Sequence, residues 1–337
     1  MKFDVFKSAD DFFLDWIKNN ASEIEIPKDN YLINEATEIS SLFIVIEGTL
    51  EVITSTRDSS NLSLGVLNVG SMIGEMSFLE GALPVASVKS TTQCRLLNIK
   101  FKLLTDEIIQ NFKLAKSFYK LIAQKLCAQL ISQNKLIGYV HTKYDNINEP
   151  LRKFIPLFSS ITDIDTAWIS NNGKFISIDN HEVLINQGEK LNYIYIVLSG
   201  RGDVYINEGG QKLKVGISKR GELLGETSMM IPEQEYASAS VVACPQMDLL
   251  AISRTMLNEK INSDLAFGLR FYKGLAIMLS QRSRDQLNRV GLNYISKLSH
   301  EKDEYFYEND ELSLDMMTSI TKASNSFDRL CNNLYNT

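Results

Sequence analysis

The sequence has few of the features that would cross-link a chain, anchor it in a membrane or direct its export. Its four cysteines show no CxxC spacing, which argues against a disulfide framework or a zinc cluster and favours reduced thiols. Every apolar run is far shorter than the roughly 20 residues that cross a bilayer, so we expect no membrane span. The first residues include aspartates where a signal peptide would carry basic and then apolar residues, so we expect a cytoplasmic protein.

An excess of basic charge is also missing. With 35 Lys and Arg against 41 Asp and Glu, the net charge is −6, so the chain has no excess of positive charge to attract a polyanion. No basic recognition helix follows Leu298, and the Arg-rich segment 280–289 is predicted to be a solvated helix face. We therefore expect no nucleic-acid partner.

Motifs for catalysis and metal binding are absent as well. The sequence has no nucleotide-binding loop, hydrolase elbow or metalloprotease motif, and no isolated pair of carboxylates spaced for acid-base work. The three histidines, His141, His181 and His300, have no Cys or acid at ligand spacing. The sequence thus predicts no catalytic residue, no metal site and no enzyme.

What the sequence does contain is a long internal repeat. The pairs of identical residues include Leu32 and Leu184, Gly48 and Gly200, Gly74 and Gly225, and Phe118 and Phe271. The offsets of these pairs lie between 151 and 153 residues, which is too long for a solenoid repeat and indicates two copies of one domain.

The repeat sets the predicted domain limits. We predict a first domain over residues 1–145, a second over 146–300, and an acidic C-terminal tail with a short helix over 301–337. The boundary between the domains is placed in the polar stretch 142–150, because it contains turn and breaker residues.

Within each copy the periodicity changes once. Short β-rich runs such as LFIVI and YIYIVL are separated by Gly and Asn turns, a pattern typical of an antiparallel sandwich or barrel. Apolar residues then recur about every four positions, which predicts an amphipathic helix. The predicted fold is mainly β with α: two tandem jelly-roll (cupin-like) β-barrels, each followed by a long amphipathic helix.

The ordered glycines and the closing Ala-Ser-Val of each copy resemble the cyclic nucleotide-binding domain family, which includes bacterial catabolite activators and regulatory subunits of protein kinase A. The segment that resembles the family's phosphate-binding cassette runs from Gly74 to Val88 in copy one and from Gly225 to Val241 in copy two. The resemblance implies that the cassette Gly presents backbone N–H groups to a cyclic phosphate. It also implies that Glu75 or Glu226 accepts from the ribose hydroxyl, and that an arginine pairs with the phosphate.

That arginine is missing from both copies. Counting back four positions from the closing Val places Pro84 and Ala237 where the family has Arg. The second cassette is two residues longer and contains Glu233 and Glu235, which would repel a phosphate, while Lys89 lies past the first cassette, off the side where the arginine projects. Loss of a charge-assisted pair worth about 1.5–3 kcal/mol, leaving the phosphate unpaired, should weaken binding about 10²- to 10³-fold or more.

The candidate binding residues are those of the two degenerate cassettes. They are Gly74, Glu75, Met76, Pro84, Val85, Ala86, Gly225, Glu226, Thr227, Ala237 and Ser238. The candidate interaction residues form the apolar stripes of the long helices: Phe118, Ile122, Leu126, Phe271, Leu275 and Leu279. We expect Glu75 and Glu226 to remain as local hydrogen-bond acceptors, and we predict no cofactor.

These features predict a non-enzymatic regulatory or scaffolding protein that acts through protein–protein interaction. A protein partner is expected, and the apolar stripes also suit a homodimer through the long helices. One alternative is a sensor of cAMP, cGMP or another nucleotide that binds mainly through the first domain. A second is a structural subunit of a larger assembly, and an enzyme with an unrecognised site is the weakest alternative.

Overall fold

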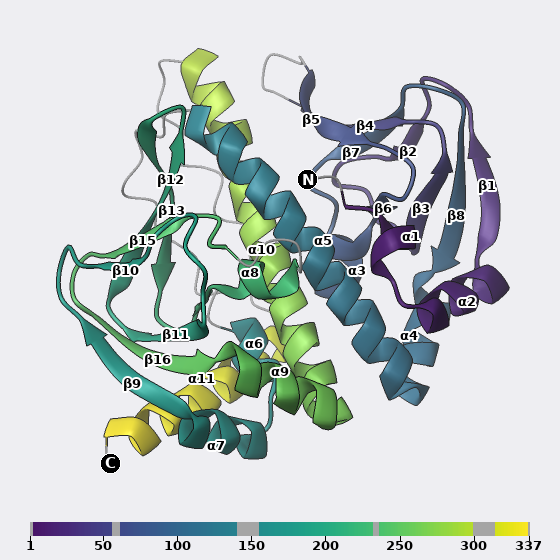
Figure 1. The fold of residues 1–337 in the computed structure, drawn as a ribbon. Coiled ribbons are helices and arrows are strands. Elements are labelled where there is room, and N and C mark those ends of the chain that lie inside the picture. The colour runs from purple at the N-terminus through teal and green to yellow at the C-terminus, as the bar shows by residue number, and fades with distance from the viewer. Residues whose placement is uncertain (1–2, 56–60, 140–154, 232–235, 299–313, 336–337) are drawn as a thin grey trace. The chain divides into compact units, whose positions relative to one another are not determined.

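The computed structural model describes residues 3–55, 61–139, 155–231, 236–298 and 314–335. These residues form two compact units (Figure 1). Unit 1 comprises residues 1–129 and 282–302, and unit 2 comprises residues 130–281 and 303–337. Both long helices therefore begin in one unit and end in the other. The predicted junction at 142–150 lies outside the described residues, so the domain limits stay predictions.

The described residues of unit 1 form eight antiparallel strands in two four-stranded sheets, with the strand orders β1-β8-β3-β6 and β2-β7-β4-β5. The strands are β1 (Ser22–Ile26), β2 (Tyr31–Ile33), β3 (Ser41–Glu47), β4 (Leu50–Ser55), β5 (Asn61–Leu67), β6 (Met72–Ile73), β7 (Ser87–Ser90) and β8 (Cys94–Lys100). The helices are α1 (Val5–Ser8), α2 (Asp11–Asn20), α3 (Glu75–Glu80), α4 (Phe101–Gln110) and α5 (Phe112–Tyr139).

Unit 2 repeats this order. Its sheets have the strand orders β14-β11-β16-β9 and β10-β15-β12-β13. The strands are β9 (Gly173–Ile178), β10 (Val183–Ile185), β11 (Tyr193–Ser199), β12 (Arg201–Glu208), β13 (Gln211–Lys219), β14 (Leu223–Leu224), β15 (Ser240–Ala243) and β16 (Met247–Ser253). The helices are α6 (Ile155–Ser160), α7 (Asp163–Asn172), α8 (Glu226–Met230), α9 (Arg254–Ser263), α10 (Leu265–Leu298) and α11 (Leu314–Tyr335).

The two sheets of each β-domain share one core. In the first domain, Ile33 and Leu50 from one sheet pack with Val45 and Leu96 from the other. Alternation along the strands sends these side chains inward, because successive residues of a strand face opposite sides. The mainly β fold of the prediction is confirmed, but the barrel is not closed. In the described residues, the short strands β2 and β6 lie at the ends of their sheets. Each of them pairs with one neighbour only, β7 for β2 and β3 for β6.

Long helices follow the strands of both copies, as the periodicity predicts. Helix α5 has 28 residues and α10 has 34. Equivalent tyrosines at the core face of each helix, Tyr119 and Tyr272, are buried, and burial raises the pKa of each to about 12. The C-terminal helix is longer than predicted, since α11 has 22 residues. It packs on α6 and α7 (Figure 1). The rings of Phe327 on α11 and Phe158 on α6 meet edge to face at a centroid distance of 4.8 Å.

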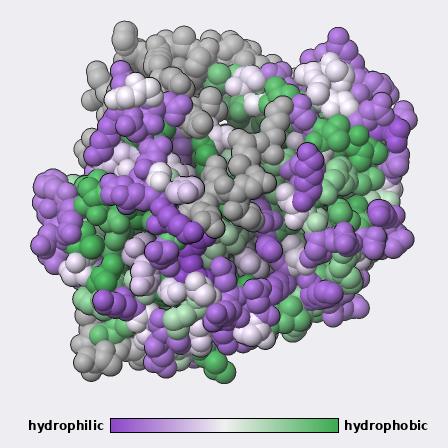
Figure 2. Space-filling view, viewed as in Figure 1, coloured by the Kyte–Doolittle hydropathy of each residue, from purple (hydrophilic) through white to green (hydrophobic). Residues whose placement is uncertain are grey.

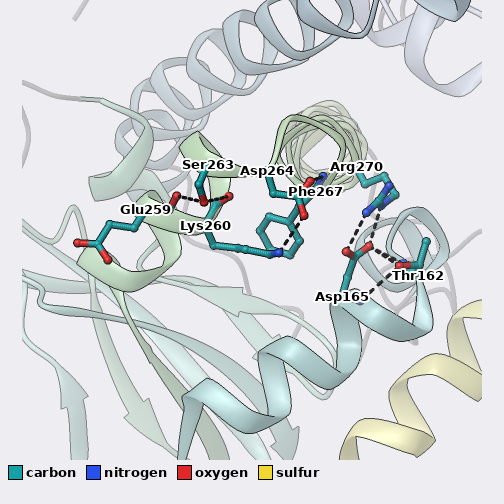
Figure 3. Close-up of polar contacts among 8 residues, drawn as sticks. All are labelled: Thr162, Asp165, Glu259, Lys260, Ser263, Asp264, Phe267 and Arg270. Carbon is teal, nitrogen blue, oxygen red and sulfur yellow. Dashed lines mark hydrogen bonds and ion pairs between the residues drawn. The ribbon is translucent and has the colours of Figure 1, made fainter.

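A polar cluster fastens α7 to α10 within unit 2 (Figure 3). The Arg270 guanidinium on α10 donates from Nε and Nη2 to the two carboxylate oxygens of Asp165, at 2.7 and 2.8 Å. The same carboxylate accepts from the backbone N–H of Thr162 at 2.8 Å, and the Thr162 hydroxyl caps α7 in return. Burial would raise the pKa of Asp165, but the hydrogen bonds from Arg270 and Thr162 outweigh it and hold the pKa below its usual value.

Candidate functional site

The first cassette begins at a turn that only glycine fits. Gly74 joins β6 to α3 with φ at +94°, in the left-handed region, and a Cβ there would lie 2.8 Å from the Ser41 carbonyl oxygen. Gly225 makes the equivalent turn between β14 and α8 with φ at +87°. A Cβ on Gly225 would approach the Tyr193 carbonyl oxygen to 3.2 Å. The repeated Gly-Glu pair therefore builds the same strand-to-helix turn twice.

The far ends of the two cassettes are also equivalent. The Ala36 N–H donates to the Pro84 carbonyl oxygen at 2.9 Å, and the Gly188 N–H donates to the Ala237 carbonyl oxygen at 2.8 Å. These matching bonds place Pro84 and Ala237 at the same point of the fold, where the resemblance puts the arginine. Neither side chain carries a charge, so neither cassette offers a guanidinium at that position.

The closing Ala-Ser-Val has a structural role in both copies. The Ser87 hydroxyl accepts from the Glu35 N–H at 2.9 Å, and the Ser240 hydroxyl accepts from the Gln187 N–H at 2.9 Å. In each domain this bond ties the end of the cassette to the turn after the second strand. The motif can therefore be retained for the fold alone.

The cassette glutamate of the first domain has a buried cationic partner. The Lys125 ammonium on α5 donates to Oε1 of Glu75, and the side chains are 13% and 3% exposed. Opposite charges that are withdrawn from water to this degree depend on each other, because either one alone would be costly to bury. Glu75 is thus a local acceptor, as predicted, and its partner Lys125 was not identified from the sequence. The two residues lie 50 positions apart in the sequence, so no short sequence pattern indicates that they pair.

The second cassette has a more polar interior. The hydroxyls of Thr227 and Ser238 lie 3.3 Å apart, whereas the first cassette has Met76 and Val85 at the matching positions. Glu226 is buried at the start of α8. The predicted acids Glu233 and Glu235 lie outside the described residues.

An arginine that the sequence analysis did not single out braces the second cassette. Arg254, the first residue of α9, donates from Nη2 to the Ser228 carbonyl oxygen at 2.9 Å and from Nη1 to the Leu191 carbonyl oxygen at 2.8 Å. Ser228 belongs to the short helix α8, and Leu191 lies in the loop between β10 and β11, so one side chain joins the cassette to that loop. Arg254 therefore holds the cassette by its backbone.

The other residues discussed in the sequence analysis lie in different surroundings. Ala86 is buried, and Lys89 pairs with Asp29 at 3.4 Å. His181 sits in a turn with a φ of +70°, whereas His141 and His300 lie outside the described residues.

Among the residues described, no group of three or more His, Cys, Asp or Glu is arranged to hold a metal ion. In the same part of the chain, no helix is both long and apolar enough to span a membrane.

The residues predicted for the interaction helices are core residues. All six are at most 2% exposed: Phe118, Ile122, Leu126, Phe271, Leu275 and Leu279. In unit 1, the Phe118 ring contacts those of Phe13 and Phe78, at centroid distances of 5.8 and 5.4 Å. The apolar stripes thus pack inside the chain. On the face shown in Figure 2, the hydrophobic residues lie in small groups among hydrophilic ones.

The comparison with protein families settles the family. The model of the cyclic nucleotide-binding domain matches residues 23–111 and 175–264, which together make up just over half of the chain. The chain belongs to the cyclic nucleotide-binding domain family. The two matches contain the two cassettes described above, so the predicted resemblance is confirmed in both copies.

Several curated proteins with cyclic nucleotide-binding domains are similar to this chain. The cGMP-dependent protein kinase egl-4 of Caenorhabditis briggsae is 23% identical over 242 residues, which cover 71% of this chain and 28% of the kinase. The regulatory subunit of cAMP-dependent protein kinase of Mycosarcoma maydis is 21% identical over 249 residues, with 71% and 42% covered. The transcriptional regulator CRP of Salmonella typhimurium is 27% identical over 97 residues, with 28% and 46% covered. The chain therefore spans less than half the length of these relatives.

Among solved structures, similar chains include regulatory subunits of protein kinase A. The cAMP-bound PfPKA-R (141-441) has a TM-score of 0.32 and 15% identity, with 85% of this chain and 86% of that chain covered. The regulatory subunit of a cAMP-independent protein kinase A from Trypanosoma cruzi, bound to guanosine, has a TM-score of 0.28 and 14% identity, with 78% and 84% covered.

Proposed function

We propose that this chain is a regulatory or scaffolding protein without enzymatic activity, built from two cyclic nucleotide-binding domains with degenerate cassettes, and that it acts through protein–protein interaction. The observation that carries the proposal is the equivalence of Pro84 and Ala237. Their carbonyl oxygens accept the same backbone bond, while neither side chain supplies a guanidinium to a phosphate.

The buried pair of the first cassette supports the same conclusion. A ribose hydroxyl would have to share Glu75 with the Lys125 ammonium, which already donates to that carboxylate. Exchanging a charged donor for a neutral one is unfavourable, because hydrogen bonds with ionised groups are about twice as strong as neutral ones.

The four cysteines are free thiols, which suits a reducing compartment, and we propose that the protein is cytoplasmic.

The proposal is tested by isothermal titration calorimetry with cAMP and cGMP. For the full chain we expect no saturable heat at micromolar concentrations of either nucleotide. The variant Pro84→Arg supplies a guanidinium at the vacant position and should raise affinity for cAMP at least tenfold, since a charge-assisted pair is worth about 1.5–3 kcal/mol. Pro27→Arg, which adds the same side chain at an exposed turn, should change nothing.

Saturable micromolar binding to the unmodified chain would overturn the proposal. If that binding disappeared in Glu75→Ala, the chain would be a nucleotide sensor that works through its first domain, which is the alternative reading. A negative titration leaves the protein partner to be identified. Affinity purification with millimolar cAMP and cGMP present should then recover the same partner as without them, because neither nucleotide is expected to bind.

A further inference from the structure

The C-terminal part of α10 belongs to unit 1 and contacts the first cassette. Arg284 donates from Nε to Oε2 of Glu80, the last residue of α3, at 3.2 Å. It also donates from Nη1 to the Leu83 carbonyl oxygen at 2.9 Å, directly before Pro84. One guanidinium thus holds both the helix and the loop of the cassette. The sequence analysis placed this arginine on a solvated face, which is wrong for Arg284.

The contact is largely withdrawn from water. The side chains of Arg284 and Glu80 are 13% and 10% exposed, unlike the surface pairs of this protein. The neighbouring Ser283 is fully buried, and its hydroxyl accepts from Nε2 of Gln129 on α5 at 2.8 Å. Two consecutive residues of α10 are therefore fastened to the cassette and to the long helix of unit 1. Breaking a sheltered pair costs more than breaking a solvated one.

The repeat shows why the first cassette takes its arginine from so far away. Arg254 begins α9 and braces the second cassette from within its own domain. Its equivalent at the start of α4 is Phe101, because the N–H of each residue donates to the matching loop carbonyl, that of Ser40 or Asn192, at 2.9 Å. Phe101 packs on Phe78 of α3 and can make no such polar brace. The second cassette is braced locally, and the first is braced from a residue 204 positions away.

The other end of α10 is anchored in unit 2. Phe267 meets the Trp168 ring at a centroid distance of 5.5 Å. Arg270 donates two hydrogen bonds to Asp165, which Figure 3 shows. Because the helix is continuous from Leu265 to Leu298, its two anchored ends are joined by one element.

We propose that Arg284 is a built-in clamp on the first cassette, and that through α10 it couples the opening of α3 to the anchorage of the helix in unit 2. The clamp needs no nucleotide. A partner that displaces α10 from its anchorage in unit 2 would therefore also loosen α3, and a partner that opens α3 would weaken that anchorage.

The test is amide hydrogen exchange, followed by mass spectrometry, on the full chain and on Arg284→Gln. We expect exchange over residues 75–83 to rise about tenfold or more, since the hydrogen bonds of a charged group are lost. Exchange over residues 265–281 should rise as well. Arg95→Gln is the matched control in unit 1, because Arg95 pairs with Glu23 and Glu47 at the surface and should leave both segments unchanged.

Unchanged exchange over 75–83 in Arg284→Gln would overturn the clamp, and a rise confined to that segment would overturn the coupling. If Arg284→Gln does not fold, as judged by circular dichroism, Glu80→Gln replaces it with the same expected result. The double variant Glu80→Arg with Arg284→Glu should bring exchange closer to the unmodified chain than either single reversal does. Effects of the two reversals that simply add would show that the pair is not the clamp.

Discussion

At the scale of single residues, the first cassette is organised around one buried carboxylate. Glu75 is 2% exposed, so its charge requires a partner inside the fold, and Lys125 supplies it. The same glutamate that the family resemblance assigns to a ligand is thereby turned into part of the chain's own structure. A ligand that used Glu75 would compete with Lys125 for this carboxylate.

Replacing Lys125 should therefore be far more damaging than replacing a surface lysine. We expect Lys125→Met to lower the free energy of unfolding by about 3–5 kcal/mol, because a buried charge is left without its partner. Adding Glu75→Gln should recover part of that loss. Lys18→Met, which breaks the exposed pair with Asp15, should cost no more than about 1 kcal/mol. Urea unfolding checks all three variants against the unmodified chain, and equal losses for the two lysines would contradict the buried pair.

At the scale of elements, the two copies fasten the same helices with different chemistry. In unit 1 the Ser117 hydroxyl on α5 donates to the carboxylate of Asp10, which caps α2. In unit 2 the equivalent position on α10 is Arg270, which reaches Asp165 on α7. A hydrogen bond from a neutral hydroxyl in one domain thus corresponds to an ion pair in the other.

The ionic tie gives unit 2 a dependence on pH. Asp165 has a lowered pKa when folded, so its contribution is complete above its unfolded value of about 3.9 and is lost as the pH falls through the folded value. We expect Asp165→Asn to lower the free energy of unfolding by about 1.5–3 kcal/mol at pH 7, with the difference from the unmodified chain shrinking below about pH 4. Thr166→Ala, a neutral change on α7, should give a difference that does not vary with pH. Urea titrations at pH 7 and pH 3.5 measure both.

The elements that repeat were predictable from the sequence, and the contacts between distant elements were not. Periodicity gave the strand-rich part and the long helices, and the glycines marked the cassette turns because no other residue adopts φ near +90° readily. Lys125 and Arg284 carry no such signal, since a charged residue on a helix is usually solvated. The length of α11 was missed for a related reason: its buried face, which includes Phe327 and Leu330, depends on α6 and α7.

At the scale of the whole molecule, the chain is two copies of one domain joined by helices that belong to both units. The residues predicted to pair with a second copy are buried in their own units instead. A homodimer through the long helices stays a prediction, and it would have to use other residues of α5 and α10. Burial within the unit explains the apolar stripe without a partner.

Substitution in the stripe should therefore change stability and not mass. We expect Phe118→Ala to lower the free energy of unfolding by about 3–5 kcal/mol, because it empties a site between α2, α3 and α5. The mass measured by light scattering after size exclusion should stay that of the unmodified chain at equal concentration. Lys120→Ala, an exposed neighbour on α5, is the control for both measurements. A drop from dimer to monomer in Phe118→Ala would place that ring in an interface.

The backbone bonds at Pro84 and Ala237 also bear on how such domains change over time. The turn is secured by a carbonyl oxygen, an atom that every amino acid possesses, so the side chain at this position is not needed to keep the turn. Under the proposed function, replacing the arginine removes affinity without unfolding the domain. Selection for the fold and selection for the ligand act on different atoms, and a duplicated domain can shed its chemistry one copy at a time while remaining a foldable module.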